Sequence, residues 1–485
     1  MASIVKKRFK QRLSKLQRRQ RRRRQTRKTR IVRRRLQQLH NQLPRLARLL
    51  CDSLAHAFTT ATALRFGLLL VAALLTIGRH TIANLLHTLG PLVPGDSSSY
   101  RRVFSQRRWS SWQLARLLAN WVIEQLASDG PLLVAGDDTV DEHHGPNVYG
   151  KGRHRDPVRS THSYTAFRWG HKWVVVAVLV RLPFSRRLWA LPILVALYRP
   201  EQEGRRHKTP PELLRQLLRV LLRWFPKRPL VCVADGNYAT HDLARLAARH
   251  SDRLTYVSHF YADAALYEVP PKTAPQGKRK GRPRQKGAKR PSPAAVVARS
   301  KRQRLNVAWY RGGQRDVEAV TGTGHWYRSG AGLAALRWVW VHDCSGSHRD
   351  EYFFTTAVEW TAAQVIETYT GRWNIETTFE EMRSCLGLET TRGWTASTVS
   401  RVGPCLFGLY TVAVVLYVGL PRYRRLGVGV LWPGKQDVTF SDALTAVRRC
   451  LWVEWVFAIP GHGREFSKLS RPFQHLLLAG LTPAP

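Results

Sequence analysis

Two acidic positions each follow a short apolar run that predicts a buried strand. Asp137 and Asp138 come directly after Pro131–Gly136, and Asp235 comes directly after Leu230–Ala234. Carboxylates held by a rigid sheet can be aimed at a common metal ion. Asp at a strand end is also an ordinary helix N-cap, because its side chain accepts hydrogen bonds from the first helical turn. These aspartates are therefore candidate metal ligands that need a further partner.

The stretch Glu367–Arg383 supplies that partner. Its residues Tyr369, Arg372, Glu376 and Arg383 lie 3, 4 and 7 positions apart, offsets that return to one face of a single α-helix. Glu–Arg pairs at this spacing are common on exposed helices, where each stabilises by about 0.2–0.5 kcal/mol. In a site, Glu376 would bind a metal while the arginines bound phosphate.

Along the chain, the acidic candidates lie at two predicted strand ends and then on a predicted helix. Asp138 (or Asp137), Asp235 and Glu376 could bind two Mg²⁺ ions, with Mn²⁺ as a substitute, and so support cleavage or transfer of a phosphodiester. Four histidines nearby raise the alternative of a His-bound zinc ion: His143, His144, His154 and His162. No two of them keep a zinc-ligand spacing with a partner pair, so the carboxylate site is preferred.

The charge of the chain indicates a polyanionic partner. The net charge is +47, and residues 1–50 alone hold 20 Lys and Arg with no Asp or Glu. This arm, with its run Arg21, Arg22, Arg23 and Arg24, is expected to bind nucleic acid. A second basic stretch contains Gly281-Arg282-Pro283-Arg284, which resembles the core of an AT-hook, so Arg282 and Arg284 are further candidate DNA contacts.

Two apolar runs, Phe66–Ile77 and Leu406–Leu420, are shorter than the roughly 20 residues that cross a bilayer, so core helices are expected and no membrane. The six cysteines have no CxxC or zinc spacing, and no secretory signal is evident. These features favour a reduced, cytoplasmic, nucleoid-associated protein. A membrane-surface protein held by the basic arm is the alternative from another class.

Other patterns predict local structure. Tyr164–Arg168 and Lys172–Val180 flank Trp169-Gly170-His171, which predicts a hairpin with its turn at these three residues. Leu305–Val358 is strand-like and rich in tryptophan. Most of these rings are expected to pack in a sheet, while Trp326 or Trp338 could stack on an unpaired base.

With these motifs the chain resembles the bacterial insertion-sequence transposases of the DDE class, in the group marked by a Y-x2-R-x3-E-x6-K signature. The signature reads Tyr369, Arg372, Glu376 and Arg383, so Arg stands where the group has Lys. The charge is kept, but the planar guanidinium has a different contact geometry. The triplet at 137–139 and the run at 234–238 resemble the aspartate motifs of the family, and the resemblance spans roughly residues 43–420.

The resemblance implies an activity and its partners. The activity is cut-and-paste transposition, with metal-dependent cleavage and strand transfer at the ends of the protein's own insertion sequence. The partners are double-stranded DNA with terminal inverted repeats and target DNA, bound by a homodimer in a synaptic complex. Asp138, directly before Thr139, is the implied ligand over Asp137, and Tyr369, Arg372 and Arg383 are implied DNA contacts. A catalytically inactive, transposase-derived DNA-binding protein is the alternative.

The expected fold is α/β, a ribonuclease-H-like mixed sheet with a β-rich insertion, preceded by an all-α N-terminal domain. The expected domains are a disordered basic arm (1–42), a helical DNA-binding domain (43–128), the first part of the catalytic core (129–260), a basic linker and β-rich insertion (261–358), the second part of the core (359–425) and a C-terminal region (426–485).

Overall fold

The structure is a computed structural model that describes residues 24–156, 159–201, 206–271, 284–425, 433–459 and 463–483. The chain forms two compact units, one made of Met1–Ser110, Leu416–Val428 and Leu444–Ala484, and the other of Ser111–Val415 and Gly429–Ala443. We call them the helical unit and the sheet unit. The candidate DNA contacts Arg21, Arg22, Arg23 and Arg282 lie outside the described residues.

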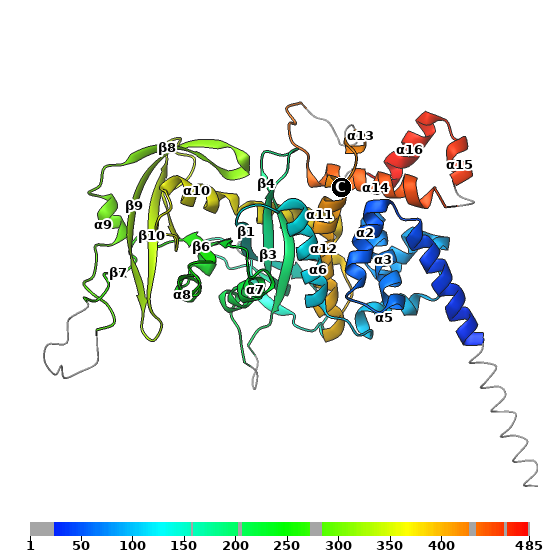
Figure 1. Ribbon diagram of the computed structural model, residues 1–485, viewed down its shortest axis with the longest axis horizontal. Coiled ribbons are helices and arrows are strands. Elements are labelled where there is room, and N and C mark those ends of the chain that lie inside the picture. The colour runs from blue at the N-terminus through cyan, green and yellow to red at the C-terminus, as the bar shows by residue number, and fades with distance from the viewer. Residues whose placement is uncertain are drawn as a thin grey trace, which may run out of the picture. The chain divides into compact units, whose positions relative to one another are not determined.

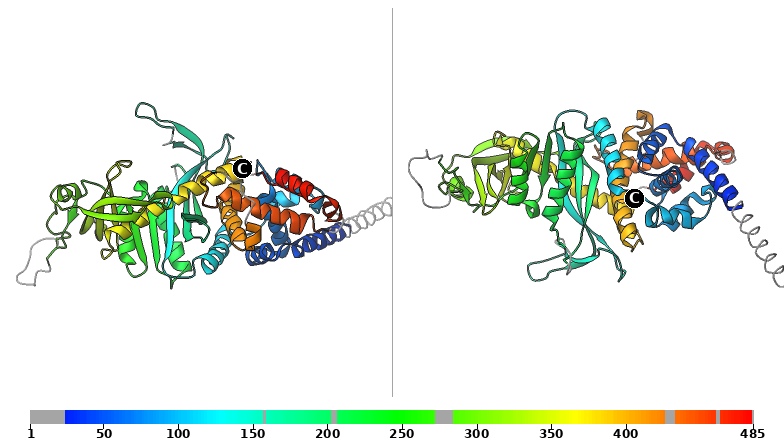
Figure 2. Two further views of the ribbon diagram at one scale, coloured as in Figure 1. Left: turned by 90° about the horizontal axis from the view of Figure 1, so that it is seen from above. Right: turned by 60° about the horizontal axis from the view of Figure 1, so that its bottom comes forward.

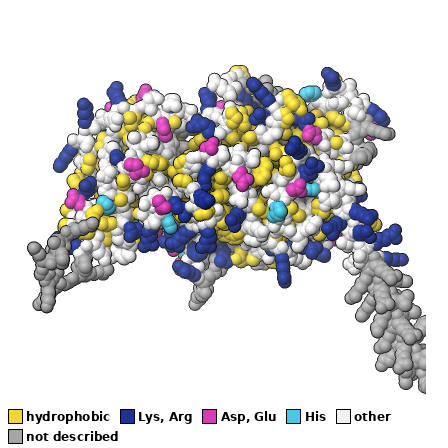
Figure 3. Space-filling view, in the orientation of Figure 1, with side chains coloured by type: hydrophobic (Ala, Val, Ile, Leu, Met, Phe, Trp, Pro, Cys, Tyr) yellow, Lys and Arg dark blue, Asp and Glu magenta, His cyan; other side chains and the backbone are white. Residues whose placement is uncertain are grey.

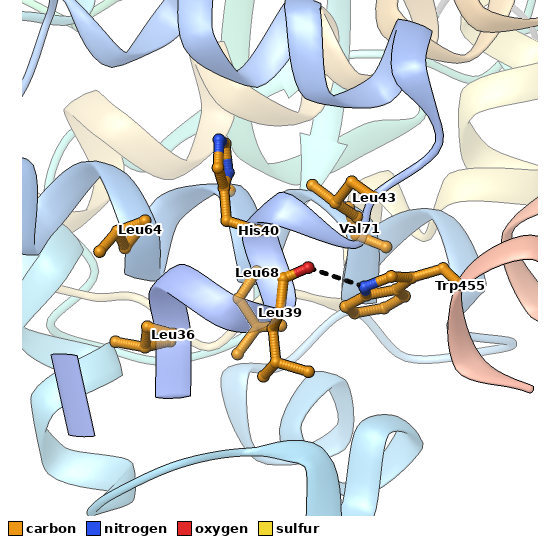
Figure 4. Close-up of a pocket in the computed structure, with 9 residues that line it drawn as sticks. Leu36, Leu39, His40, Leu43, Leu64, Leu68, Val71 and Trp455 are labelled. Atoms are coloured by element: carbon orange, nitrogen blue, oxygen red, sulfur yellow. Dashed lines mark hydrogen bonds between the residues drawn. The ribbon is translucent and has the colours of Figure 1, made fainter. Parts of the chain in front are cut away.

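The helical unit packs around leucine-rich helix faces. Its described helices are residues 24–41, α2 (Arg45–Ala55), α3 (Thr60–Leu75), α4 (Ile82–Leu89), α5 (Ser97–Ser105), α13 (Arg422–Arg425), α15 (Gly463–Lys468), α16 (Arg471–Leu481) and the larger part of α14 (Phe440–Leu451). The Trp455 indole donates a hydrogen bond to the Leu39 carbonyl at 3.0 Å, beside a small apolar pocket (Figure 4). Residues 24–41, expected to belong to a disordered arm, are helical because Leu36, Leu39 and Leu43 bury their side chains here.

The sheet unit contains a large mixed sheet (Figure 1). Its strands are β1 (Leu132–Glu142), β2 (Gly152–Arg155), β3 (Phe167–Arg181), β4 (Leu188–Tyr198), β5 (Leu230–Ala234), β6 (Leu254–His259), β7 (Leu266–Tyr267), β8 (Gln303–Ala308), β9 (Gln314–Arg328), β10 (Gly332–Asp343) and β11 (Glu351–Thr355). The order β4-β3-β1-β5-β6 has β3 antiparallel to β1 and β4, and β5 parallel to β1 and β6. This is the strand order of the ribonuclease-H fold, so the predicted fold class is confirmed.

The predicted insertion extends the same sheet. β11 pairs antiparallel with β6, and β10, β9 and β7 follow in order, while β8 pairs with β9. The short helix α9 (Pro293–Val297) precedes β8. The chain then returns to the core through α10 (Ala362–Gly371) and α11 (Asn374–Leu386).

Helices lie against both faces of the core sheet. On one face, Leu214 of α7 (Pro210–Trp224) packs so closely that a Cβ on Gly136 would lie 2.7 Å from it. On the other, Thr378 of α11 donates a hydrogen bond to the Ala190 carbonyl of β4 at 2.9 Å. The connecting helices α6 (Ser111–Leu126), α8 (His241–Arg249) and α12 (Ala396–Val418) complete the layers. α12 alone among the described helices is long and apolar enough to cross a membrane, but 67% of its most apolar window is buried inside the protein, as expected of a core helix.

One predicted hairpin is wrong. Residues 169–171 form no turn, because β3 runs unbroken from Phe167 to Arg181. Gly170 serves a different purpose, since a Cβ there would collide with the Asp141 carbonyl oxygen of β1. The glycine thus permits close approach of two strands, which is its other common role inside a sheet.

Candidate functional site

The two aspartate motifs lie at the same end of neighbouring parallel strands. The β1–β5 pairing ends at Gly136↔Ala234, so Asp137 and Asp235 each follow the last pair. Asp235 accepts hydrogen bonds from the Asn237 backbone and side-chain nitrogens, both at 3.1 Å, and so caps a short 3-10 turn. Asp137 does not end its strand as predicted, because β1 continues to Glu142 in partnership with β3.

The signature residues are divided between two helices and the turn that joins them, rather than lying on the single helix predicted. α10 ends at Gly371 and α11 begins at Asn374. Hydrogen bonds between residues three apart, such as Arg372 N to Tyr369 O and Glu376 N to Trp373 O, tighten the chain at the junction. The junction keeps Arg372 and Glu376 adjacent, with their side chains 3.0 Å apart.

Arg372 joins the helix to the first strand. Its guanidinium donates to Asp137 Oδ2 at 2.7 Å through one nitrogen, and a second nitrogen lies 3.0 Å from Glu376 Oε1. Only 6% of Arg372 is exposed. The arginine therefore bridges two of the predicted carboxylates, and this position differs from the direct phosphate contact expected from the signature.

The carboxylates form an electrostatically coupled group. Burial raises the pKa of Asp137, Asp235 and Glu376, and Arg372 lowers each pKa only in part. Asp235 acts on both other carboxylates and raises their pKa further. One guanidinium thus leaves negative charge uncompensated, as expected where a divalent cation binds. An all-carboxylate donor set suits a hard ion such as Mg²⁺.

Asp138 points the other way. Alternate side chains of a strand lie on opposite faces of the sheet, so Asp137 and Asp138 cannot share a face. Asp138 Oδ2 accepts a hydrogen bond from the Tyr238 hydroxyl at 2.9 Å, and Oδ1 lies 2.9 Å from Lys172 Nζ. The geometry therefore favours Asp137 over Asp138 as the partner of Glu376, the reverse of the order that the resemblance implied. Tyr238 ends the 234–238 motif, but no pattern in the sequence indicated that it would contact Asp138 or that Lys172 would.

The other two signature residues are held by the protein itself. Tyr369 is 5% exposed and stacks on Phe353 with ring centroids 4.0 Å apart. Burial also raises its pKa to about 12, so the phenol stays neutral, and its low exposure leaves little of the ring open to DNA. Arg383 donates to the Thr139 hydroxyl and, at 3.2 Å, to Glu389. It thereby holds α11 against β1 two residues beyond Asp137.

Basic side chains lie over other parts of the described surface. Arg24 and Arg284 are both exposed, as a DNA contact requires. Figure 3 shows Lys and Arg gathered in its lower middle, around α7 and α8. There Arg215, Arg219 and Arg223 recur every four residues along α7, on the side away from its buried leucines.

A ribbon formed by β2 and the start of β3 carries exposed aromatic rings. Phe167 is 46% and Trp169 54% exposed. The Arg153 guanidinium lies 3.8 Å from the Phe167 ring centre, and Lys151 Nζ lies 5.3 Å from that of Trp169. In both views of Figure 2 this teal segment projects from the sheet. We call these four side chains the aromatic–basic ribbon.

The tryptophans considered for base stacking are packed in the insertion. Trp338 is 2% exposed, and Trp326 lies against Phe260 and Phe354 with ring centroids 5.6 and 5.8 Å apart. Sheet packing, the ordinary expectation, accounts for both. The exposed rings that could meet a base lie instead at positions such as Trp169, which sequence patterns had placed in a turn.

Comparison with known proteins identifies the family. The family described as DDE superfamily endonuclease matches residues 53–316, a segment that includes Asp137 and Asp235 and ends before Glu376. A piggyBac transposase synaptic complex with hairpin DNA, solved by cryo-EM, aligns with a TM-score of 0.40 at 9% sequence identity, over 92% of this chain and 83% of that chain. No curated protein matches the chain. Because the family match spans more than half of its residues, the protein belongs to the DDE superfamily endonucleases.

Proposed function

We propose that this endonuclease-family chain is a DNA transposase that cleaves and joins DNA at the ends of its own insertion sequence. The observation that carries the proposal is the grouping of Asp137, Asp235 and Glu376 around Arg372 at one end of a ribonuclease-H sheet. The proposed partners are double-stranded DNA with terminal inverted repeats, target DNA and a second copy of the chain. The bacterial insertion-sequence origin and the Y-R-E-K grouping belong to the same proposal.

The three carboxylates are the proposed ligands of two Mg²⁺ ions, with Mn²⁺ as substitute and Asp138 as the alternative to Asp137. When bound, the ions would activate the attacking oxygen and stabilise the leaving oxygen of the phosphodiester. The protein's own contribution is positional. Arg372 orients Asp137 and Glu376, and Arg383 fixes α11 on β1, so the helix carboxylate stays beside the strand carboxylates.

We infer that the aromatic–basic ribbon contacts the same DNA. Residues 167, 169 and 171 of β3 share a face, and the register places His171 opposite Asp141 and Val175 opposite Asp137. The ribbon therefore continues the face of the sheet that bears Asp137, about 27 Å away along the strand at 3.4 Å per residue. Flat rings flanked by cations suit stacking on bases and binding to the backbone of an unpaired or distorted strand.

The decisive experiment uses a duplex that carries the inverted repeats flanking the gene, with Mg²⁺ or Mn²⁺. We expect strand cleavage, and we expect Asp137→Asn, Asp235→Asn and Glu376→Gln each to reduce it by about 10³-fold or more, because removal of a metal ligand takes away several kcal/mol of transition-state stabilisation. Glu380→Gln, four residues along α11 and exposed, is the matched control.

Asp138→Asn separates the two aspartates of the first motif. If Asp137 is the ligand, Asp138→Asn retains more activity than Asp137→Asn. The opposite ranking would identify Asp138 as the ligand. DNA binding without cleavage by the unaltered protein would support the alternative of an inactive DNA-binding protein.

A further inference from the structure

A second group of metal-ligating side chains lies on the same sheet. Asp141 on β1, His143 directly after β1 and His171 on β3 each offer one ligand atom, and these atoms all lie within 4.8 Å of one another. The pairing of β1 with β3 brings these residues together, because residues 141 and 143 share a face and Asp141 pairs directly with His171. Four residues of strand, about 13 Å, separate Asp141 from Asp137, so this group is distinct from the three carboxylates.

The group is buried and incompletely hydrogen-bonded. Asp141, His143 and His171 are 3%, 7% and 2% exposed. Asp141 Oδ1 makes no hydrogen bond of good geometry within the described structure, although it pairs with His143 Nε2 at 3.1 Å. Burial acts to raise the pKa of Asp141, but His143 and His171 outweigh it and lower this pKa. A cation between the oxygen and the nitrogen would complete the contacts of the carboxylate.

The tautomer of His171 also suits a metal ligand. Its Nε2 lies 3.0 Å from the Tyr149 carbonyl, which can only accept, so Nε2 carries the proton. In the neutral imidazole Nδ1 then keeps a lone pair that a metal ion can use, and it lies 3.9 Å from Asp141 Oδ2. Metal-bound histidines usually donate their other N–H to such an acceptor. Ligand atoms around a tetrahedral zinc ion lie about 3.3 Å apart. The two oxygens of Asp141 lie 3.1 Å from His143 Nε2 and 3.9 Å from His171 Nδ1, and one ligand atom from each residue fits within 4.8 Å, so small side-chain movements would close the group around an ion.

We propose that Asp141, His143 and His171 bind a structural Zn²⁺ ion. Two imidazoles and one carboxylate favour zinc over magnesium, whereas the three carboxylates favour magnesium. Three protein ligands leave a fourth position that a water molecule would fill. Burial of all three side chains excludes a substrate-sized molecule from this position, so the proposed ion is structural rather than catalytic. The ion would tie the end of β1 to β3 and, through the Tyr149 carbonyl, to the loop before β2. It would thus brace the base of the aromatic–basic ribbon.

The test measures bound zinc in full-length protein that carries Asp235→Asn and Glu376→Gln, so that metal at the carboxylate site does not contribute. After addition of Zn²⁺ and removal of the excess, we expect about one zinc per chain. His143→Ala and His171→Ala should reduce this to near zero, while His144→Ala, at the exposed neighbouring histidine, should retain it. No bound zinc in the parent, or zinc retained by both buried-histidine variants, would overturn the proposal.

Two further measurements guard against misfolding of the variants. With Co²⁺ in place of zinc, the parent should show visible ligand-field absorption bands, and chelation should lower its melting temperature until Zn²⁺, but not Mg²⁺, restores it. A parent without bands and without a chelator effect counts against the site. Neither readout involves DNA cleavage, so failure here is distinguishable from failure of the proposed transposase activity.

Discussion

At the scale of single residues, Arg372 decides how the carboxylates are held. A buried guanidinium between two carboxylates compensates part of their charge and fixes their direction. Sequence spacing predicted that Arg372 and Glu376 would be neighbours on one helix, and they are neighbours although Arg372 lies in the turn before α11. It could not predict that Asp137 would be the third partner, because that hydrogen bond joins positions 235 residues apart.

The raised pKa of Glu376 leads to a stability prediction. Burial raises this pKa in the folded state, so the folded protein prefers the neutral acid, and ionisation destabilises it as the pH rises above the unfolded value of about 4.3. We therefore expect Glu376→Gln to increase the melting temperature of the metal-free protein at pH 7.5. The increase should disappear at about pH 3, where Glu376 is protonated in both the folded and the unfolded protein.

Added Mg²⁺ should have the opposite effect on the same pair of proteins. An ion at a hundred times its Kd stabilises the folded protein by about 2.7 kcal/mol. Added Mg²⁺ should therefore raise the melting temperature of the unaltered protein more than that of Glu376→Gln. Differential scanning calorimetry with and without Mg²⁺ measures both effects, and Glu380→Gln should behave like the unaltered protein. A Glu376→Gln variant that is less stable at pH 7.5 without metal would show that the ion pair of Glu376 with Arg372 outweighs the cost of burying the carboxylate.

At the scale of elements, the patterns that were readable in sequence were local ones. β5 has the predicted bounds, Leu230–Ala234, and Asp235 follows it, because an apolar run that ends in Asp-Gly-Asn is unambiguous. The turn predicted at Trp169-Gly170-His171 was wrong, since a glycine can mark a turn or a close approach of two strands and only the partner strand distinguishes them. The Asp141, His143 and His171 group was likewise hidden, because it depends on the register of β1 against β3.

The aromatic–basic ribbon gives a prediction at this scale. Stacking of a base on an aromatic ring is worth about 1–3 kcal/mol, so Phe167→Ser with Trp169→Ser should weaken binding to a duplex with single-stranded ends by about tenfold or more. Phe473→Ser, at a similarly exposed ring on α16, is the control. Fluorescence anisotropy measures the affinities. Equal affinity of the ribbon variant and the control would remove the ribbon from the DNA-binding surface.

At the scale of the whole molecule, an acidic site lies within a strongly basic chain. Lys and Arg number 79 against 32 Asp and Glu, so the long-range field attracts a polyanion. The same field disfavours a free cation, so a divalent ion can bind only where several ligand atoms converge at short range. The grouping of Asp137, Asp235 and Glu376 meets that need, so the proposed transposase combines a surface that attracts DNA with an interior group of carboxylates suited to Mg²⁺.

The basic arm should govern the salt dependence of binding rather than its specificity. Removing one cation that neutralises a phosphate makes the slope of log K against log salt shallower by about 0.9, so replacing Arg21, Arg22, Arg23 and Arg24 by Gln should reduce the slope by up to about 3.6. Because phosphate contacts carry no sequence information, affinity should fall equally for a duplex with the terminal repeats and for a scrambled duplex of the same length. Binding titrations from low to moderate salt on both duplexes measure the slope and the affinities. A decrease confined to the repeat duplex would mean that the arm reads bases, and an unchanged slope would mean that it does not touch the DNA.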